Sequence, residues 1–327
     1  MLLVGGASRR FGSPKALARL EGRTLAEHAW ALLGEACEER IAVGKLADRL
    51  ALPFPLLDDG TEVRAPIAGV VAGLHAARHD VSVVVPVDCP RLTPGAVRAL
   101  GEAAAVPQTG PLPGAYAKAM LPQLEERLAA GELSLRGVNG TEMELDERLL
   151  ANVNTAADLA ALERPGHALV VGGTGMLAGL TRALRHRGHP VTFLARRGVD
   201  LGGGIVQVAV DYRDDRALTD GLADAVDDRG PIELAVAWVH SDARAAPATV
   251  AAAVAPGGRL FQVFGTRVWP LDPVPLHVAY RRVLLGSAGG RWLTHDEIAD
   301  GVLRAIDGDR PLAIVGERDI ASTGTKS

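Results

Sequence analysis

A segment near the start of the chain combines the residue types that bind phosphate groups. The run LLVGGASRRFGSPKAL occupies residues 2–17 and contains three glycines among three cations. Glycines allow successive backbone N–H groups to approach phosphate oxygens. Arg10 and Lys15 add positive charge where negative charge accumulates as pyrophosphate leaves. The spacing differs from Walker A. The segment predicts a nucleoside triphosphate site for nucleotidyl transfer, and the alternative is an ordinary glycine-rich turn with surface arginines.

A carboxylate follows the most apolar segment of the first half. The run VSVVVPV, residues 81–87, predicts a central strand that is buried on both faces, and Asp88 comes directly after it. Open α/β sheets place their ligands at the carboxyl ends of the strands. A carboxylate there can hold Mg²⁺, which bridges phosphate oxygens during displacement. The alternative is that Asp88 caps the turn before Pro90.

Four further segments follow the glycine-rich run in a fixed order. They are RAPIAG at 64–69, VDCP at 87–90, GPLPGAY at 110–116 and NVNTAADL at 152–159. Together with GGASRRFGSPK at 5–15, they resemble the motifs of the molybdenum cofactor guanylyltransferase family, the MobA-like nucleotidyltransferases. The resemblance covers about residues 1–163.

This resemblance implies a reaction and a set of site residues. The terminal phosphate of molybdopterin, with or without bound molybdenum, would attack the α-phosphorus of GTP and release pyrophosphate. A phosphate nucleophile is already anionic, so positioning and charge neutralisation supply most of the catalysis. The implied catalytic residues are Arg10, Lys15 and Asp88. Mg²⁺ would be held by Asp88 with Asn152 and Asn154, or the two asparagines would contact the acceptor phosphate. The implied nucleotide-binding residues are Leu3, Gly5, Gly6, Ser8, Gly12, Lys15, Asp58, Pro66, Gly69 and Asp88.

One departure from the family pattern concerns the base of the nucleotide. Ala65, preceded by Arg64, stands where the family has a glycine that helps to shape the base pocket. The expected substrate is GTP, and a CTP-dependent molybdopterin cytidylyltransferase remains the alternative.

The second half opens on another glycine loop. Gly172-x-x-Gly175 lies between an expected strand at 167–172 and an expected helix at about 176–187, which is the context of a dinucleotide fingerprint. Arginines after the next strand suit the 2′-phosphate of NADP. This half resembles a short form of the short-chain dehydrogenase/reductase family. The expected NADP-binding residues are Gly172, Thr174, Gly175, Met176, Arg196, Arg197, Asp211 and Tyr212.

The second half also departs from that family. The catalytic Y-x-x-x-K is absent, because Arg281, Arg282, Val283 and Leu284 follow Tyr280. Three alternatives stay open: an NADP-binding domain without activity, a different proton-transfer set of His240, Ser241 and Tyr280, or a domain with an empty site. The domain could therefore be regulatory, or could carry a reductase activity of its own.

The candidate site residues of both halves must be positioned by strands and helices. Short apolar runs alternate with helical segments in both halves, and Pro165-Gly166 interrupt the pattern. We expect an α/β protein of two doubly wound three-layer domains: a nucleotidyltransferase domain at 1–164 and an NAD(P)-binding Rossmann domain at 165–327.

Composition narrows the class of protein. A net charge of −4 argues against nucleic acid or an acidic membrane surface as a partner. Two distant cysteines, Cys37 and Cys89, argue against a disulfide framework or a Cys-ligated zinc site. No signal pattern and no apolar run of about 20 residues is evident. We expect a cytoplasmic enzyme that acts on small molecules, and the family resemblance implies molybdenum-insertion or molybdoenzyme proteins as further partners.

Overall fold

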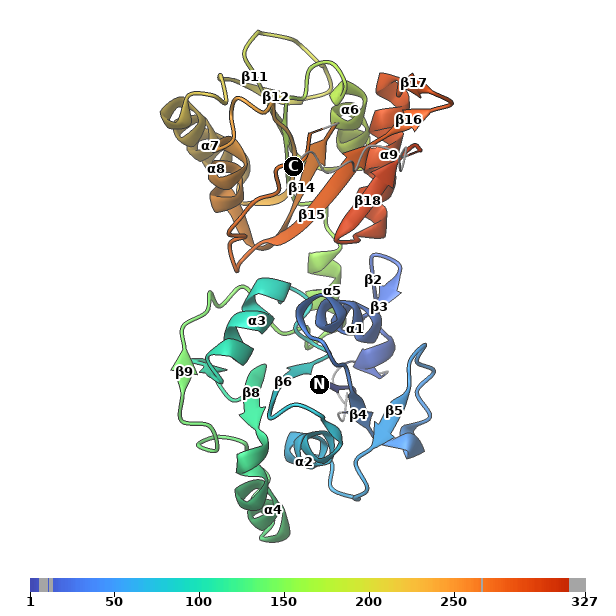
Figure 1. The fold of residues 1–327 in the computed structure, drawn as a ribbon, viewed down its shortest axis with the longest axis vertical. Helices are drawn as coiled ribbons and strands as arrows, with labels where there is room; N and C mark the ends of the chain where they lie inside the picture. The colour runs from blue at the N-terminus through green and yellow to red at the C-terminus, as the bar shows by residue number, and fades with distance from the viewer. Residues whose placement is uncertain (6–10, 12–13, 266, 318–327) are drawn as a thin grey trace, which may run out of the picture. The chain divides into compact units, whose positions relative to one another are not determined.

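Both halves of the chain build a twisted sheet covered by helices. The computed structural model describes residues 1–5, 11, 14–265 and 267–317. The chain divides into two units, Met1–Arg164 and Pro165–Ser327. Each unit is described by itself below, with elements labelled as in Figure 1.

The sheet of the first unit has the order β5-β4-β1-β6-β8. β1 pairs in parallel with β4 and β6, β4 pairs in parallel with β5, and β8 runs antiparallel to β6. These strands are β1 (Leu2–Leu3), β4 (Ala42–Gly44), β5 (Leu56–Asp58), β6 (Val81–Pro86) and β8 (Gly114–Ala117). The order reverses beside β1, so the carboxyl ends of β1 and β6 form the expected ligand-binding edge.

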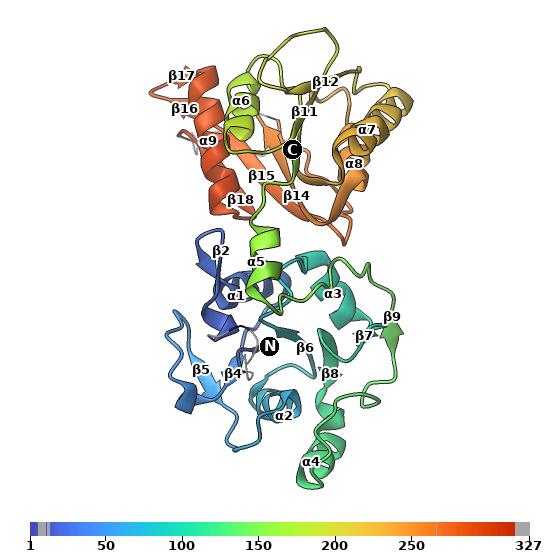
Figure 2. The same cartoon turned by 180° about the vertical axis from the view of Figure 1, so that it is seen from behind.

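Helices cover both faces of this sheet. Leu2 and Val4 belong to a core cluster with α1 and α3, whereas Met1 and Leu3 belong to a cluster with α2 and α4. Neighbouring residues of a strand point to opposite faces, so the alternation creates three layers, as Figures 1 and 2 show. The helices are α1 (Leu25–Ala36), α2 (Pro66–Ala76), α3 (Pro94–Glu102), α4 (Leu121–Ala129) and α5 (Ala156–Leu162).

Short elements complete the first unit. β2 and β3 form a hairpin, and β7 pairs in parallel with β9. Their bounds are β2 (Arg19–Leu20), β3 (Arg23–Thr24), β7 (Val106–Pro107) and β9 (Glu142–Met143), with 3₁₀ turns η1 (Lys15–Leu17), η2 (Leu46–Asp48) and η3 (Lys118–Met120). Reciprocal capping boxes start two helices: Thr24 with Glu27 at α1, and Thr155 with Asp158 at α5.

The second unit has a seven-stranded sheet in the order β12-β11-β10-β13-β14-β15-β18, and all its pairs are parallel. The strands are β10 (His167–Val171), β11 (Val191–Ala195), β12 (Val206–Ala209), β13 (Ile232–Trp238), β14 (Val254–Phe264), β15 (Ala279–Leu285) and β18 (Leu312–Val315). This strand order, with its reversal between β10 and β13, is that of a Rossmann fold. The α/β class with two doubly wound sheets is therefore confirmed.

Two helices cover each face of the second sheet. α6 and α9 enclose one core cluster, and α7 and α8 enclose the other. A small hairpin of β16 and β17 follows β15. The bounds are α6 (Ala178–His186), α7 (Asp215–Arg229), α8 (Ala246–Ala253), α9 (His295–Gly308), β16 (Ser287–Ala288) and β17 (Arg291–Trp292). No helix among the described residues is long and apolar enough to cross a membrane.

Candidate functional site

Three polar side chains from distant parts of the first unit meet at the carboxyl end of β6. The ammonium Nζ of Lys15 lies 3.0 Å from Oδ2 of Asp88 and 2.9 Å from Oδ1 of Asn154. Lys15 begins η1, Asp88 follows β6, and Asn154 precedes α5. The side chains of Lys15 and Asp88 are 17% and 23% exposed, so solvent screens this ion pair only in part. Asp88 was expected at the carboxyl end of a strand, and the structure places it there in contact with Lys15.

The backbone around Asn154 is fixed from two sides. The N–H of Val153 donates to the carbonyl oxygen of Asp88 at 2.8 Å, which joins the asparagine segment to the end of β6. Oδ2 of Asp158 accepts from the N–H groups of Asn154 and Thr155, both at 2.8 Å. These N–H groups hold the pKa of Asp158 below its usual value. The helix cap therefore also orients the residue that contacts Lys15.

A buried thiol positions the other asparagine. Sγ of Cys89 donates to Oδ1 of Asn152 at 3.0 Å. Burial and the neighbouring charge of Asp88 raise the pKa of Cys89 to about 12, so the thiol keeps the proton that it donates. Asn152 and Asn154 consequently differ: the first is held by Cys89, and the second contacts the cation of Lys15.

The oxygens around Lys15 are suited to a hard divalent ion. Carboxylate and amide oxygens are ligands that Mg²⁺ accepts, with water and substrate phosphates completing the shell. Oxygens of Asp88 and Asn154 already converge on one cation, the Lys15 ammonium. Within the described part of the chain, no group of three or more His, Cys, Asp or Glu side chains is arranged to hold a metal. The fit to Mg²⁺ thus rests on one carboxylate with neutral oxygens.

The expected phosphate-binding loop begins at the end of β1. Gly5 is exposed, whereas the side chain of Leu3 is buried and packs against α2. A Cβ on Gly69 would lie 2.8 Å from the Leu3 side chain, so the glycine lets α2 approach β1 closely. If Leu3 contacts the nucleotide, it therefore does so through its backbone atoms. Four expected site residues lie outside the described residues: Gly6, Ser8, Arg10 and Gly12.

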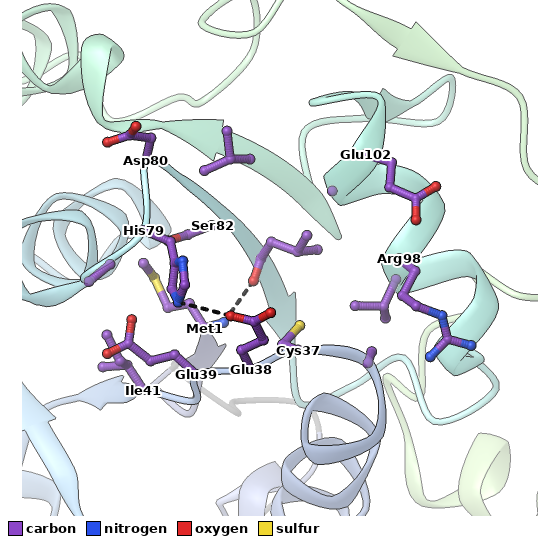
Figure 3. Close-up of a pocket in the computed structure, with 16 residues that line it drawn as sticks. Met1, Cys37, Glu38, Glu39, Ile41, His79, Asp80, Ser82, Arg98 and Glu102 are labelled. Atoms are coloured by element: carbon purple, nitrogen blue, oxygen red, sulfur yellow. Dashed lines mark hydrogen bonds and ion pairs between the residues drawn. The ribbon is translucent and has the colours of Figure 1, made fainter.

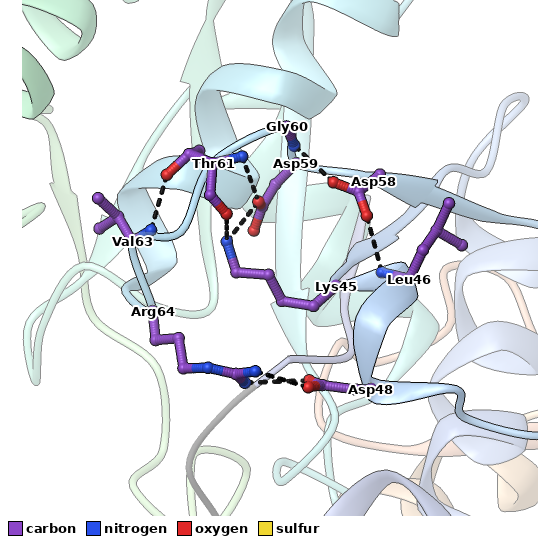
Figure 4. A network of polar contacts seen from close by, with 9 residues as sticks. All are labelled: Lys45, Leu46, Asp48, Asp58, Asp59, Gly60, Thr61, Val63 and Arg64. Carbon is purple, nitrogen blue, oxygen red and sulfur yellow. Dashed lines mark hydrogen bonds and ion pairs between the residues drawn. The ribbon is translucent and has the colours of Figure 1, made fainter.

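Asp58 lies at the same carboxyl edge, at the end of β5, and closes two turns. Its carboxylate accepts from the N–H of Leu46 at 2.8 Å and of Gly60 at 2.7 Å. The N–H of Gly60, followed by that of Leu46, lowers the pKa of Asp58. Figure 4 shows this contact beside Lys45, which binds Asp59. The neighbourhood of Asp58 is therefore fixed by its own hydrogen bonds.

The segment before α2 is anchored by an ion pair. Nη1 and Nη2 of Arg64 lie 3.2 and 2.8 Å from the two carboxylate oxygens of Asp48, as Figure 4 shows. Ala65, the N-cap of α2, has φ −141° and ψ 151°, an extended conformation open to any residue. Pro66 is the first helical residue. Alanine in place of the family glycine therefore causes no backbone strain here.

A cavity of about 520 Å³ lies at the opposite edge of the first sheet. Its lining includes Met1, Cys37, Glu38, His79, Arg98 and Glu102, shown in Figure 3. It also includes Val81, the first residue of β6, whereas Asp88 follows the other end of that strand. This cavity is separate from the Lys15, Asp88 and Asn154 cluster.

In the second unit, the turn after β10 has the glycine geometry of a dinucleotide loop. Gly172 and Gly175 have φ +78° and +90°. A Cβ on Gly172 would lie 2.7 Å from the carbonyl oxygen of Trp238, so this position requires glycine on two grounds. α6 begins at Ala178, so Thr174 and Met176 belong to the turn and the expected helix start at about 176 was two residues early.

The other expected NADP-binding residues lie at the same edge. Arg196 and Arg197 follow β11 and are exposed. Asp211 follows β12, where hydrogen bonds from Arg213 lower its pKa to about 2. Tyr212 is half-buried and packs against the core under α7 and α8. Asp211 is thus paired with Arg213 at this edge.

The proposed proton-transfer set of His240, Ser241 and Tyr280 is wrong. Tyr280 lies in β15, level with Leu260 of β14 and hence with Ala235 of β13. Ala235 precedes His240 by five residues, so the Cα levels of Tyr280 and His240 differ by about 16 Å along the strands at 3.3 Å per residue. The hydroxyl of Tyr280 donates to Gln262 at 2.6 Å and accepts from the N–H of Leu271 at 3.1 Å. Residues 267–278, which join β14 to β15, contain no helix.

Sequence patterns did not predict some residues of the site. Cys89 gave no signal, because a lone cysteine has no metal-ligand spacing and its contact with Asn152 depends on the fold. Trp238 was not among the expected site residues, and its carbonyl oxygen proves to explain Gly172.

By sequence, the first half of the chain is similar to known proteins. The family model described as "MobA-like NTP transferase domain" matches residues 1–140. A "Probable molybdenum cofactor guanylyltransferase" of Deinococcus radiodurans is 36% identical over 187 residues, covering 50% of this chain and 93% of that protein. A "Molybdenum cofactor guanylyltransferase" of Burkholderia vietnamiensis is 33% identical, covering 50% and 94%.

Solved structures similar to about half of the chain include short-chain dehydrogenases. One from Serratia marcescens is 19% identical, with a TM-score of 0.36, and covers 46% of this chain and 95% of its own. A metagenomic short-chain oxidoreductase in complex with NADP is 18% identical, with a TM-score of 0.36, and covers 47% and 96%. The Rossmann assignment of the second unit rests on its own strand order. By sequence, the chain belongs to the molybdenum cofactor guanylyltransferase family.

Proposed function

We propose that residues 1–164 transfer GMP from GTP to the terminal phosphate of molybdopterin. An oxygen of that phosphate forms a bond to the α-phosphorus of GTP, the bond from the α-phosphorus to the β-bridging oxygen breaks, and pyrophosphate leaves. The products are molybdopterin guanine dinucleotide and pyrophosphate. The observation that supports this most strongly is the convergence of Lys15, Asp88 and Asn154 at the carboxyl end of β6.

The residues present suit this reaction chemically. The nucleophile is already anionic, so the site needs positive charge and alignment rather than a strong base. Lys15 would offset charge on the leaving phosphates, and Arg10 is proposed to act with it. Mg²⁺, when bound by Asp88 and Asn154, would offset phosphate charge during displacement. Asn152, held by Cys89, is proposed to orient the acceptor phosphate.

The histidines of the first unit fit a reaction without a histidine base. His28 contacts the carbonyl oxygen of Leu20 at 2.8 Å, and His75 contacts Glu125 at 2.7 Å. His79 lies 3.7 Å from Glu38 beside the cavity at the opposite edge. None of these three contacts involves Asp88 or Asn154.

An assay with each nucleotide tests which base the proposed transferase prefers. The full chain is incubated with molybdopterin, Mg²⁺ and one of GTP, CTP, ATP or UTP, and pyrophosphate release is followed. We expect the highest kcat/KM with GTP. Equal or faster turnover with CTP would assign the chain as a cytidylyltransferase instead, and no molybdopterin-dependent release with any nucleotide would reject the transfer itself.

A second function is proposed for residues 165–327, namely binding of NADP. The positive φ angles of Gly172 and Gly175 before α6 favour a pyrophosphate at this turn. Arg196 and Arg197 favour the 2′-phosphate. Titration with NADPH and NADH, followed by nucleotide fluorescence, tests both points: NADPH should bind more tightly, and Arg196→Ala with Arg197→Ala should remove that preference. No binding of either nucleotide at millimolar concentration would leave this unit without a nucleotide site.

A further inference from the structure

We propose that Lys15 is a built-in competitor for the metal at the transfer site: its ammonium holds the cation position, so a divalent ion binds appreciably only together with the nucleotide. This inference rests on the proposed nucleotidyl transfer for the identity of the nucleotide. It adds an order of binding to that proposal, and its test does not require turnover.

The geometry places the ammonium where the ion would have to be. Nζ of Lys15 lies within 3.0 Å of two oxygens that come from separate segments, Oδ2 of Asp88 and Oδ1 of Asn154. Mg²⁺ binds oxygens at about 2.0–2.1 Å. An ion that approached both oxygens from the side of Nζ would come within contact distance of Nζ, so the two cations exclude each other there by contact and by charge.

Burial strengthens the competition. The side chains of Lys15 and Asp88 are 17% and 23% exposed, so water and salt screen their interaction less than at an open surface. The backbone of Asn154 beside them is held by Asp158, which accepts from its N–H. A divalent ion that enters alone must therefore displace an ammonium that already has two oxygen partners.

A nucleoside triphosphate changes this balance. It brings several negative charges, to which the flexible four-carbon side chain of Lys15 can turn. Lys15 is also the first residue of η1 and the last cation of the segment expected to bind phosphates. With the ammonium on phosphate, Asp88 and Asn154 become available to the ion. Because linkage is reciprocal, a nucleotide that promotes metal binding is itself bound more tightly when the metal is present.

The test measures metal affinity without nucleotide. Mn²⁺, which suits the same oxygen ligands, is titrated into the full chain and free Mn²⁺ is followed by electron paramagnetic resonance. The proteins are wild type, Lys15→Met, Lys15→Gln and Lys15→Arg. Lys15→Met and Lys15→Gln both remove the charge, so the result does not depend on one variant folding. We expect each to bind Mn²⁺ about tenfold more tightly than wild type, the equivalent of one partly buried ion pair.

Two controls separate competition from other effects. Lys15→Arg keeps the positive charge and should bind Mn²⁺ as weakly as wild type. Lys15→Met combined with Asp88→Asn should lose the gain, because the ligand is removed. Lys118→Met, in η3, should leave Mn²⁺ binding at the wild-type value.

The second arm adds a non-hydrolysable GTP analogue, and the Mn²⁺ that the analogue binds without protein is measured separately and subtracted. Wild type should then bind Mn²⁺ at least about tenfold more tightly than it does alone, whereas Lys15→Met should gain less. Unchanged or weaker Mn²⁺ binding by the charge-removing variants without nucleotide would overturn the competition. That outcome is distinct from failure of the proposed function, which would appear as absent pyrophosphate release by wild type.

Discussion

The ammonium of Lys15 lies 3.0 Å from the carboxylate of Asp88, although 73 residues separate them in sequence. Parallel pairing of β1 with β6 brings the ends of these strands side by side, and η1 directs Lys15 back towards that edge. The same ammonium contacts Asn154, 139 residues away, before α5. The cluster is thus a product of the whole first unit, and its chemistry follows from the sheet edge that assembles it.

Removing the carboxylate at the centre of this cluster should abolish transfer without unfolding the protein. Asp88→Ala is expected to lower kcat for pyrophosphate release on the order of 100-fold or more, the usual cost of losing a preorganised electrostatic group. Circular dichroism and the thermal midpoint should stay near wild type. Asp146→Ala is the matched control, because Asp146 pairs with Arg148 in the same unit. Near-normal activity of Asp88→Ala with Mg²⁺ would remove Asp88 from the metal site.

Cys89 should act as a positioning residue through Asn152. Cys89→Ala leaves Oδ1 of Asn152 without the thiol donor and is expected to lower kcat about three- to tenfold, the equivalent of one modest hydrogen bond. The KM for GTP should change little. Cys89→Ser restores a donor and should recover most of the loss, a rescue that a purely volumetric role would not give. Identical kcat values for Cys89→Ala and wild type would reject this role.

The thiol of Cys89 should also stay protonated over the working range of the enzyme. Its pKa is raised to about 12 by burial, so deprotonation would remove the donor only near that pH. The ratio of wild-type to Cys89→Ser activity should therefore be constant from neutral to moderately alkaline pH. A change of this ratio with a midpoint well below 12 would contradict it.

The two glycines of the second loop should respond differently to alanine. Both have positive φ, so each substitution introduces strain of about 1–3 kcal/mol. Only at Gly172 would the new Cβ also meet a backbone atom, the carbonyl oxygen of Trp238 at 2.7 Å. Gly172→Ala should therefore lower the free energy of unfolding of the second unit more than Gly175→Ala. Chemical denaturation followed by tryptophan fluorescence gives the comparison, and equal losses would refute the close contact.

The cap of α9 should stabilise the second unit at neutral pH, and this stabilisation should be lost in acid. Hydrogen bonds from Arg291, and then from the N–H of Thr294, lower the pKa of Glu297 from 4.5 to about 2. A depressed folded-state pKa means that the ionised form stabilises the fold above 4.5, and that the contribution disappears as the pH falls towards 2.

Glu297→Gln should therefore lower the thermal midpoint at neutral pH, and the difference from wild type should shrink through that window. Asp300→Asn, on the exposed side of the same helix, is the control. A difference between wild type and Glu297→Gln that does not depend on pH would contradict this assignment.

Local patterns in the sequence were sufficient for much of the fold. The β-branched run at 81–87 became β6, and Thr155 with Asp158, three residues apart, formed the cap of α5. Both depend on neighbours in sequence, namely burial of a continuous apolar run and a side chain that bonds its own helix start.

Features set by distant contacts were not predictable in this way. The antiparallel β8 and the edge strand β18 were not foreseen, because pairing partners are chosen by the assembled sheet. Tyr280 was considered as a proton donor from its type, whereas its strand register places it far from His240. The Cys89 and Asn152 contact likewise joins segments that only the fold brings together.

Mass spectrometry of the reaction product tests the transfer reaction itself. The full chain is incubated with GTP, Mg²⁺ and molybdopterin, and the pterin products are separated and their masses are measured. Asp88→Ala is the inactive control. Molybdopterin guanine dinucleotide should form in the same amount as pyrophosphate with wild type and be absent with Asp88→Ala. Wild type that leaves molybdopterin unmodified, or Asp88→Ala that forms the dinucleotide at the wild-type rate, would contradict the role given to the Lys15, Asp88 and Asn154 cluster.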